Sequence, residues 1–487
     1  MYGTNLIEVP LRPVAALQDV IGLQRTTSLL TAAADFRRLA EGRTIWNISS
    51  TAAGGGVADM LQVLVGYAND LAVDIRWLVI TGDTEFFRIT KRVHNRIHGQ
   101  AGDGGELGHK ELDHIREVML ANAESLGAMV KAGDLVLLHD PQTAGLAEPL
   151  TSHGAHVIWR SHIGIDGEND LSRSAWDFLD PLISPAEAYV FTRPSYVPAT
   201  IPSAQAWIIP PSIDPFSPKN QAMDTDCVRT VLTHIGLFPG DANATEAHCH
   251  YTRRDGSAGE VTEAASIVAD ELPGPDDPMV IEVSRWDRLK DMIGVMQGFA
   301  TYVAPGGPGW LVLAGPSVEG VTDDPEGAIV FAETVAEWQK LPAEQRSRVV
   351  LLTLPMTDAD DNAAMVNALQ RHARVVIQKS LAEGFGLTVA EGMWKARPVV
   401  ASAVGGIRDQ VAPGTGILID DPTDLRSFGR AVRTLLDDPA LADHMGAAAR
   451  EYVSDHYVGD RHLLRYANLF TALITDDREL ATAHAAR

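Results

Sequence analysis

Apolar residues along the chain gather in short continuous runs, and the stretches between these runs carry apolar residues at helical spacing. The segment VADMLQVLVGYAND (57–70) is one such helical stretch. Runs that are apolar at consecutive positions predict strands buried on both faces, as in parallel sheets covered by helices. We expect strands at 44–49, 74–82, 134–140, 156–162, 188–194 and 206–211 in the first half, and at 278–286, 310–316, 348–355, 374–380, 397–406 and 416–421 in the second.

The alternation of strand and helix repeats in both halves of the 487-residue chain, which is too long for one ordinary core. We therefore expect two doubly wound α/β domains. The Pro- and Ser-rich stretch 208–220 breaks the periodicity and predicts the boundary. The expected domains are 1–216 and 217–455, followed by a helical tail, 456–487, that packs back on the first domain. The polar segment 241–261 is expected to be an excursion that interrupts neither sheet.

Charge and composition narrow the class of protein. The formal net charge is −24, which disfavours binding to nucleic acid or to an anionic membrane. Only two cysteines occur, Cys227 and Cys249, so no disulfide framework is expected, and this count suits a reducing cytoplasm. No apolar run reaches the roughly 18–20 residues of a membrane span, and the first residues lack the apolar core of a signal peptide. We expect a cytoplasmic protein.

A glycine-rich loop follows the first strand. Residues 49–59 read SSTAAGGGVAD, and the three glycines directly precede a helix. Such a loop lets the backbone approach a ligand, and the helix N-terminus offers N–H groups to an anion. The loop matches neither a Walker loop nor G-x-G-x-x-G, so a tight strand-to-helix turn stays open as an alternative. The candidate phosphate-binding residues are Gly54, Gly55 and Gly56.

Two cations follow the first strand of the second half. Arg285 and Lys290 lie in SRWDRLKD, just after VIEV. Ligands of doubly wound sheets bind beyond the carboxyl ends of the strands. An arginine fork and a lysine point charge at that edge suit a diphosphate. A solvated charged turn is the alternative.

A second loop at the same edge carries two glutamates. LAEGFG (381–386) lies between the strand 374–380 and a helix, with Glu383 in the loop and Glu391 inside the helix. Glu391 has a structural alternative, because a carboxylate near a helix N-terminus is stabilised by the dipole. Glu383 suits sugar hydroxyls, which would satisfy its charge beside a diphosphate. The N–H groups expected to face a ligand belong to Phe385, Gly386, Leu387 and Thr388.

The first half also places polar residues at strand ends. His139 and Asp140 follow one strand, and Arg160 and His162 lie at the end of the next. A single histidine or aspartate at such a position is often only a cap. Four on adjacent strand ends favour a polar pocket.

Two histidine-containing clusters have the composition of metal sites. His94 and His98 are four residues apart on a predicted helix, without the glutamate of H-E-x-x-H. The sequence HCH (248–250), with Cys227 and His234, matches no common zinc spacing. We interpret both as solvated residues and expect no metal.

These motifs together resemble family-4 retaining glycosyltransferases of GT-B fold. The pair Glu383 and Glu391, with GFGLTVAEGMW, resembles that group's E-x7-E signature, and SRWDRLKD resembles its diphosphate clamp. The resemblance runs from about residue 44 to 455. It implies two Rossmann-like domains facing a central cleft. Segments in the first half, such as GDTEFFRITKRVHNRIHG and LLHDPQTAGL, further resemble trehalose glycosyltransferring synthases and retaining trehalose phosphorylases.

The resemblance implies a role for each donor-side residue. Arg285 and Lys290 would bind the diphosphate, Glu391 the ribose, and Glu383 the donor glucose. His162 and Asp140 would contact the same glucose, and the glycine loop would approach the phosphates. The residues that could line the acceptor side are Lys91, Asn95, His139, Gln142 and Arg160.

The implied reaction joins glucose from UDP- or ADP-glucose to free glucose as α,α-trehalose, reversibly and with the leaving phosphate as base. No cofactor is implied, and a homodimer is suggested. A trehalose phosphorylase and a family-4 enzyme with another acceptor stay open. So do two other classes, a dinucleotide-dependent dehydrogenase or epimerase using the glycine loop and a non-catalytic sugar-nucleotide sensor.

Overall fold

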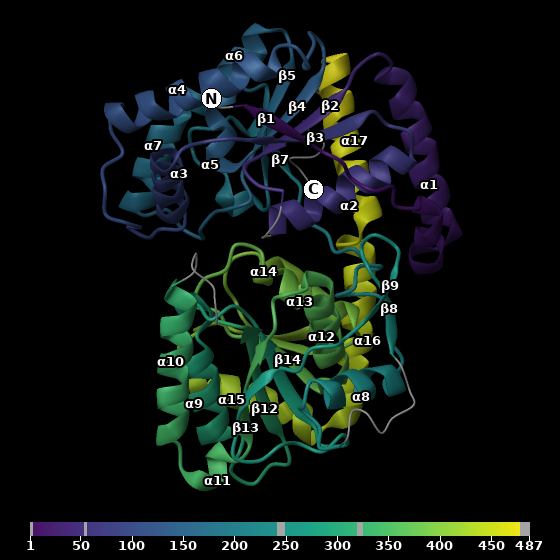
Figure 1. The fold of residues 1–487 in the computed structure, drawn as a ribbon, viewed down its shortest axis with the longest axis vertical. Helices are drawn as coiled ribbons and strands as arrows, with labels where there is room; N and C mark the ends of the chain where they lie inside the picture. The colour runs from purple at the N-terminus through teal and green to yellow at the C-terminus, as the bar shows by residue number, and fades with distance from the viewer. Residues whose placement is uncertain (1–2, 53–55, 241–248, 319–324, 478–487) are drawn as a thin grey trace. The chain divides into compact units, whose positions relative to one another are not determined.

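The computed structural model describes residues 3–52, 56–240, 249–318 and 325–477. The chain divides into two compact units (Figure 1). Unit 1 comprises Met1–Ser212 and Tyr457–Arg487, and unit 2 comprises Ile213–His456. The division after Ser212 lies inside the Pro- and Ser-rich stretch 208–220, four residues before the predicted boundary at 216. The chain returns to unit 1 for its last helix.

Unit 1 is built on a seven-stranded sheet with the order β1-β3-β2-β4-β5-β6-β7. All neighbours in this sheet run parallel except β1 and β3. Its strands are β1 (Thr4–Ile7), β2 (Ile45–Ser49), β3 (Ile75–Ile80), β4 (Leu135–His139), β5 (His156–Arg160), β6 (Ala188–Phe191) and β7 (Ala206–Ile208).

Helices cover both faces of this sheet. They are α1 (Gln18–Leu39), α2 (Gly56–Asp70), α3 (Thr84–Ile97), α4 (His109–Leu126), α5 (Asp140–Thr143), α6 (Ala147–Ser152), α7 (Asp170–Ile183) and α17 (Gly459–Thr475). Successive residues of β4 belong to opposite cores: Leu135 and Leu137 pack with α1, α2 and α17, and Val136 and Leu138 with α3, α4 and α7. The double burial explains why the strands read as unbroken apolar runs.

Unit 2 repeats this plan with the strand order β10-β13-β12-β11-β14-β15-β16, in which only β10 is antiparallel to its neighbour. Its strands are β10 (Ser266–Val268), β11 (Met279–Val283), β12 (Trp310–Pro316), β13 (Val349–Leu354), β14 (Val375–Gln378), β15 (Val399–Ser402) and β16 (Gly416–Ile419). Its helices are α8 (Thr225–His234), α9 (Met292–Tyr302), α10 (Pro325–Lys340), α11 (Ala343–Arg346), α12 (Ala359–His372), α13 (Leu387–Trp394), α14 (Ile407–Gln410), α15 (Leu425–Asp437) and α16 (Pro439–His456). The predicted fold class of two doubly wound parallel sheets is confirmed.

The strand order reverses at one point in each sheet. In unit 1 the chain leaves β2 for β3 on one side and later reaches β4 on the other. In unit 2, β11 is flanked in the same way by β12 and β14. Loops beyond the carboxyl ends diverge at such a switch point and leave a crevice for ligands. The loops after β4, β11 and β14 contain the predicted residues Asp140, Arg285, Lys290 and Glu383.

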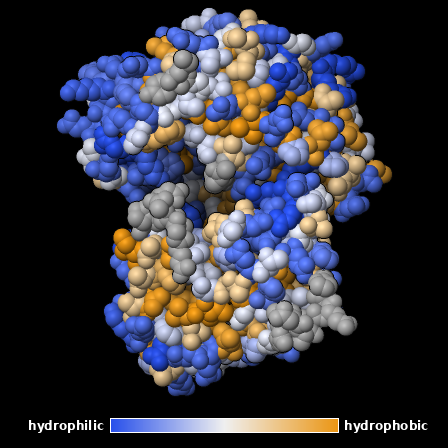
Figure 2. Space-filling model, in the orientation of Figure 1, coloured by the Kyte–Doolittle hydropathy of each residue, from blue (hydrophilic) through white to orange (hydrophobic). Residues whose placement is uncertain are grey.

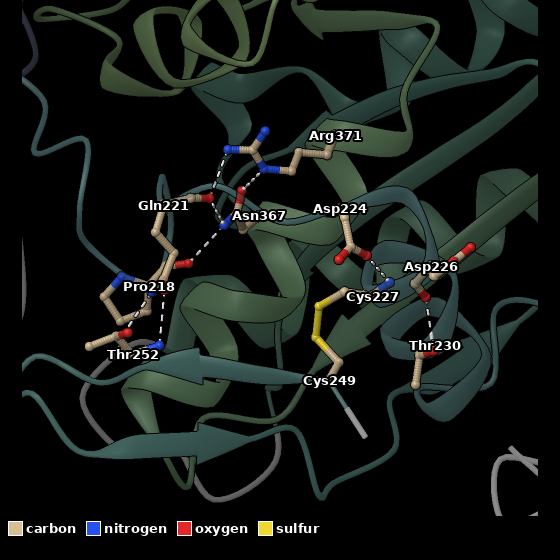
Figure 3. Close-up of a disulfide and its surroundings, with 10 residues drawn as sticks. All are labelled: Pro218, Gln221, Asp224, Asp226, Cys227, Thr230, Cys249, Thr252, Asn367 and Arg371. Atoms are coloured by element: carbon tan, nitrogen blue, oxygen red, sulfur yellow. Dashed lines mark hydrogen bonds between the residues drawn. A yellow bond between two sulfur atoms is a disulfide. The ribbon is translucent and has the colours of Figure 1, made fainter. Parts of the chain in front are cut away.

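The described part of the polar excursion, residues 249–261, forms a small hairpin within unit 2, made of β8 (His250–Thr252) and β9 (Ala258–Glu260), and this hairpin joins neither large sheet. Arg253, in the hairpin turn, forms ion pairs with Asp358 and Asp361 at the start of α12, at 2.6 and 2.9 Å. The Gln221 side chain bonds both backbone groups of Thr252, at 2.8 and 2.9 Å (Figure 3). The hairpin is therefore fixed to the body of unit 2.

The two cysteines are paired, contrary to the expectation of solvated linker thiols. Cys227 of α8 and Cys249 form a disulfide with their Cα atoms 4.9 Å apart (Figure 3). Cys249 is also buried. The sequence did not reveal this pairing because the hairpin docking on α12 brings together two residues 22 positions apart. The pair forms a single cross-link, not a framework of several.

Four strands were not predicted. β1 and β10 are antiparallel edge strands of four and three residues, and their side chains are intermediate or exposed, so they lack an unbroken apolar run. β8 and β9 alternate exposed and buried residues over only three positions each. Short edge strands carry little periodic signal.

One part of the surface of unit 1 is strongly polar. In Figure 2, hydrophilic residues cover the region formed by α3, α4 and α7. Across the described part of the chain, no helix is long and apolar enough to cross a membrane.

Candidate functional site

The loop after β11 places Arg285 and Lys290 at the switch point of unit 2. Lys290 ends a short 3-10 turn, Arg288–Lys290, that Asp287 caps by accepting from Leu289 N at 2.8 Å. Arg285 extends outward with 65% of its side chain exposed, and it pairs with Asp287 at 3.0 Å. Lys290 is mostly buried. The loop thus supplies one adaptable and one fixed cation.

The loop after β14 brings Glu383 into direct contact with Lys290. The two side chains form an ion pair, and each is about one-seventh exposed, at 14% and 16%. Glu383 Oε2 also accepts a hydrogen bond from Ser380 Oγ at 3.3 Å. The backbones of the two loops meet where Leu381 N donates to Leu289 O at 2.7 Å. The fold therefore brings two predicted residues, 93 positions apart, into contact at one edge of the sheet.

Gly386 shapes this loop because its backbone is left-handed, with φ +84°. A Cβ atom there would lie 3.0 Å from Ile407 and 3.2 Å from Glu383 Cγ. Any other residue would strain the backbone and push Glu383 away. Helix α13 begins at the next residue, Leu387. The N–H groups of Leu387 and Thr388 are in its first turn, where the helix itself offers no acceptor.

Glu391 lies inside α13 and is buried, with 7% exposure. Its carboxylate pairs with Lys219 at 3.5 Å. Its backbone carbonyl accepts from Lys395 Nζ at 3.1 Å, and Lys395 also bonds Asn220 Oδ1 at 2.9 Å. Burial lowers the pKa of Lys395 well below its ordinary value. A capping role for Glu391 does not fit, since the first turn of α13 contains no acidic residue.

Below these loops lies a polar layer that the sequence reasoning missed. Lys379, fully buried, pairs with Asp291 and donates to Pro422 O at 2.7 Å. Glu282, on the central strand β11, is also fully buried and accepts from Ser284 Oγ at 3.2 Å. Burial raises the pKa of Glu282 to about 8. A signal did exist, because a glutamate and a lysine interrupt the apolar runs MVIEV and VVIQKS.

In unit 1 the structure brings His139, Asp140, Arg160 and His162 together. His139 Nδ1 lies 2.9 Å from His162 Nε2, and His139 Nε2 lies 3.2 Å from Asn47 Oδ1. Arg160 Nε donates to His162 Nδ1 at 3.2 Å. His162 must then carry its proton on Nε2 and donate it to His139 Nδ1, so His139 donates from Nε2 to Asn47. Both rings are therefore neutral, and their hydrogen bonds run in one direction, from His162 to His139 and from His139 to Asn47.

The electrostatics support neutral imidazoles in this pair. Burial, together with the charge of Arg160, lowers the pKa of His139 and of His162 well below the ordinary value. Asp140 adopts φ +63° and accepts from His162 N at 2.8 Å. Burial raises the pKa of Asp140 to about 6. Sequence reasoning missed Asn47 and also Tyr466 of α17, whose hydroxyl accepts from Arg160.

The remaining predicted residues of unit 1 are less closely joined. Gln142 lies on α5, which packs against α3, the helix that carries Lys91 and Asn95. Lys91 is exposed, while Asn95 is half-buried. Gly56 is the first residue of α2. Gly54 and Gly55 lie outside the described residues.

The two histidine-containing clusters have other surroundings. His94 and His98 pack edge to face at the end of α3, with centroids 5.0 Å apart. Cys227 and Cys249 are in the disulfide. Within the described segments, no group of three or more His, Cys, Asp or Glu side chains is placed to hold a metal ion.

Comparisons with known proteins agree with this architecture. Residues 47–198 match the family described as "Trehalose synthase, N-terminal domain", and residues 354–452 match "Glycosyl transferases group 1". A trehalose synthase of Rubrobacter xylanophilus is 33% identical over 440 residues, which cover 89% of this chain and 91% of that protein. A trehalose phosphorylase of Pleurotus pulmonarius is 26% identical over 429 residues, 84% of this chain and 54% of that protein.

Among solved structures, a UDP-forming α,α-trehalose-phosphate synthase from Burkholderia xenovorans, in complex with glucose-6-phosphate, is similar in fold. Its TM-score is 0.63 at 14% identity, and the match covers 89% of this chain and all of that one. At this identity the likeness shows the GT-B fold alone. The resemblance drawn from the sequence motifs is confirmed: the chain is a glycosyltransferase that belongs to the trehalose synthase family, within the GT-B enzymes of family 4.

Proposed function

We propose that the chain is a retaining glucosyltransferase that forms α,α-trehalose, reversibly, from a nucleoside-diphosphate glucose and glucose. The observation that carries the proposal is the contact of Lys290 with Glu383 at the switch point of unit 2. In this proposal Lys290 is the cation for phosphate and Glu383 the carboxylate for sugar hydroxyls, and Arg285 lies on the same loop as Lys290. Membership of the trehalose synthase family supports the choice of product.

The donor would be held along the carboxyl edge of unit 2. Arg285 and Lys290 bind the diphosphate, the arginine as a fork and the lysine as a point charge. Glu383 accepts the glucose hydroxyls, and Glu391 those of the ribose. The N–H groups of Phe385, Gly386, Leu387 and Thr388 add donors for oxygen atoms. Lys219 joins this set because it pairs with Glu391.

Transfer breaks the bond between the anomeric carbon and the phosphate oxygen, and the bonding electrons leave with the phosphate. Lys290 and Arg285 stabilise that negative charge as it develops. The leaving phosphate takes the proton of the acceptor hydroxyl, whose oxygen bonds the anomeric carbon on the same face. The configuration is retained without a covalent enzyme intermediate. Glu383 and Glu391 are thus binding groups, unlike the paired carboxylates of a glycosidase.

Unit 1 would supply the remaining sugar contacts. His162 and Asp140 contact the donor glucose in this proposal, and one Asp140 oxygen is used by His162 N. His139, Gln142 and Arg160 line the acceptor side with Lys91 and Asn95. Gly56, the first residue of α2, would approach the phosphates with the two glycines that precede it in the sequence. His139 and His162 hold each other in one tautomer, which fixes the direction of their N–H bonds.

The proposal is tested by a matrix of donors and acceptors. UDP-, ADP- and GDP-glucose, and glucose 1-phosphate, are each combined with glucose and other sugars, and products are resolved by anomeric proton NMR. We expect α,α-trehalose from at least one nucleotide-glucose. A different linkage, or no product from any glucosyl donor, contradicts the proposal.

A phosphorylase is the second candidate, favoured by the match to trehalose phosphorylases over 84% of this chain. It would use phosphate to cleave trehalose into glucose 1-phosphate and glucose, and the same cations would hold the phosphate. Phosphate-dependent release of glucose 1-phosphate without nucleotide would favour it. Transfer of glucose from glucose 1-phosphate to an acceptor other than glucose would indicate an enzyme with a different product.

We further propose that the reaction needs no metal or cofactor, since the phosphate charge is met by Arg285 and Lys290. Dialysis against EDTA should leave the rate unchanged, and a loss of rate that Mg²⁺ restores would contradict this.

A cytoplasmic homodimer is part of the same proposal. Light scattering tests the homodimer, and cell fractionation tests the cytoplasmic location.

A further inference from the structure

A hydrogen-bonded relay joins Glu282 to Glu383 beneath the proposed donor site. Gln378 Nε2 donates to Ser284 Oγ and to Ser380 Oγ, each at 3.0 Å. Ser284 donates onward to Glu282 at 3.2 Å, and Ser380 donates to Glu383 at 3.3 Å. Each serine hydroxyl has one hydrogen, so both are committed to the carboxyl groups once the amide donates to them. The relay therefore fixes the orientation of the Gln378 amide and of the two serine hydroxyls.

Glu282 has the surroundings of an uncharged carboxylic acid. It is fully buried on the central strand, between Leu313 of β12 and Ile377 of β14 in register. One of its oxygens, Oε2, is buried and has no hydrogen-bond partner. An ionised carboxylate with an unpartnered oxygen in such a place is costly. A proton on Glu282 reduces that cost, because a neutral group is less costly to bury than a charged one.

The charges that face Glu282 are already balanced without it. Lys379, at the end of β14, and Lys290, in the turn after β11, are the cations that act on it, and Asp291, the cap of α9, is the anion. Lys379 is paired with Asp291, and Lys290 is paired with Glu383. Ionised Glu282 would add one negative charge beside Lys290. Burial outweighs both lysines, which is why the pKa of Glu282 is raised to about 8.

We propose that Glu282 is a positioning residue of the donor site that acts in its neutral, protonated form, and that loss of its proton weakens binding of the donor diphosphate. The inference rests on the proposed function, because it assigns a diphosphate to Lys290. Neutral Glu282 leaves the positive potential of Lys290 to the diphosphate. The relay that holds Glu383 through Ser380 is compatible with this form, because Glu282 Oε1 still accepts from Ser284. By linkage, a bound diphosphate in turn favours the protonated form.

The test is the pH dependence of nucleotide binding, measured by titration calorimetry with UDP and with ADP between pH 6.5 and 9.5. The dissociation constant of the wild type should rise above pH 8, by up to about tenfold per pH unit. Glu282→Gln stays neutral and should lack this rise. Glu337→Gln removes an exposed carboxylate that pairs with Lys340, and this control should keep the wild-type slope. A flat wild-type profile, or the same rise in Glu282→Gln, overturns the proposal.

A second measurement needs no ligand and no activity. The proton that the folded protein holds on Glu282 makes the wild type lose stability as pH rises from the ordinary glutamate pKa near 4.5 to about 8, and the loss is then complete. Relative to the wild type, Glu282→Gln should therefore gain stability over that window and not beyond it. A constant difference across pH would contradict a protonated Glu282.

The outcomes separate this inference from the proposed function. If nucleotide binding shows the expected slope but no sugar is transferred, the proposed function fails and the role of Glu282 stands. If trehalose is formed but binding is independent of pH, the role of Glu282 fails and the function stands. If none of UDP, ADP and GDP, titrated in the same way, binds at any pH, both are wrong.

Discussion

One buried cluster in each unit holds titratable groups in their neutral form, and the two clusters do so in opposite senses. In unit 1 the cluster holds two bases, the buried His139 and the partly buried His162, beside the cation Arg160. Unit 2 buries an acid, Glu282, beside two lysines that each already pair with a carboxylate. Arg160, by contrast, donates its hydrogen bonds to neutral groups in the described residues: His162, Tyr466 and a backbone carbonyl.

The difference shows what each unit can offer a ligand. In unit 1 the hydrogen bonds run in one direction through neutral rings, which suits the orientation of uncharged sugar hydroxyls. In unit 2 the ion pairs can be exchanged for pairs with a charged ligand, which suits a diphosphate. The two clusters should therefore respond differently to substitution and to pH.

The largest expected effect is from Lys290→Ala, which removes the cation of unit 2 that lies closest to Glu383. A lost donor to charge that develops in the transition state costs about 10²–10³ in kcat, or about 3–4 kcal/mol. Steady-state rates with the best donor measure it. Lys340→Ala, which removes an exposed lysine of the same unit, is the control. A rise in KM alone, with kcat kept, would contradict a role in the chemistry.

The disulfide should contribute to the stability of unit 2 alone, because the only cross-link in the described residues is Cys227–Cys249 of that unit. Closing a loop of 22 residues restricts the unfolded chain and stabilises by about 3 kcal/mol. Cys227→Ser should lower the free energy of unfolding of unit 2 by that amount. Calorimetry with two resolved transitions checks this, and the transition of unit 1 is the internal control. Equal shifts of both transitions would contradict the assignment.

Glu391→Ala tests the ribose assignment in unit 2. It removes the proposed hydroxyl contacts and leaves Lys219 without its carboxylate. Hydrogen bonds to charged groups contribute about 1.5–3 kcal/mol, so nucleotide affinity should fall by about 10- to 100-fold, with a smaller change in kcat. Glu391→Gln, which keeps the shape, should fall between. Unchanged nucleotide binding in the alanine variant would show that the ribose lies elsewhere.

The sequence predicted the features of the two units that depend on apolar runs and on the loops that follow them. Twelve apolar runs correspond to the twelve mutually parallel strands of the two sheets, because most of these strands are buried on both faces and so carry apolar residues at consecutive positions. Arg285, Lys290 and Glu383 were placed together because the carboxyl ends of parallel strands share an edge.

What the sequence did not reveal depends on contacts between distant residues. Lys219 meets Glu391 across 172 positions of chain, with no motif around the lysine. Tyr466 reaches Arg160 only because α17 returns to unit 1. Glu282 was visible as a charge in an apolar strand, but its neutral state depends on the burial of its side chain.

The smallest expected effect comes from His462 of α17 and bears on the buried bases of unit 1. Both of its ring nitrogens are buried without a hydrogen-bond partner, and Met60, Leu64 and Tyr67 lie around the same small cavity. Burial, with Arg160 adding to it, lowers the pKa of His462 well below the ordinary value of 6.5. Below pH 6.5 the unfolded chain therefore binds a proton that the folded chain does not bind, and the free energy of unfolding falls.

His462→Phe removes the ring that binds this proton. The free energy of unfolding of this variant, relative to the wild type, should therefore improve by about 1.4 kcal/mol between pH 7.5 and pH 5.5. Urea unfolding at both pH values measures the difference. His153→Phe, at an exposed site of the same unit, should follow the wild type. If the stability of His462→Phe changed with pH as that of the wild type does, His462 would have to be protonated in the folded state. It would then not be one of the neutral bases that unit 1 buries.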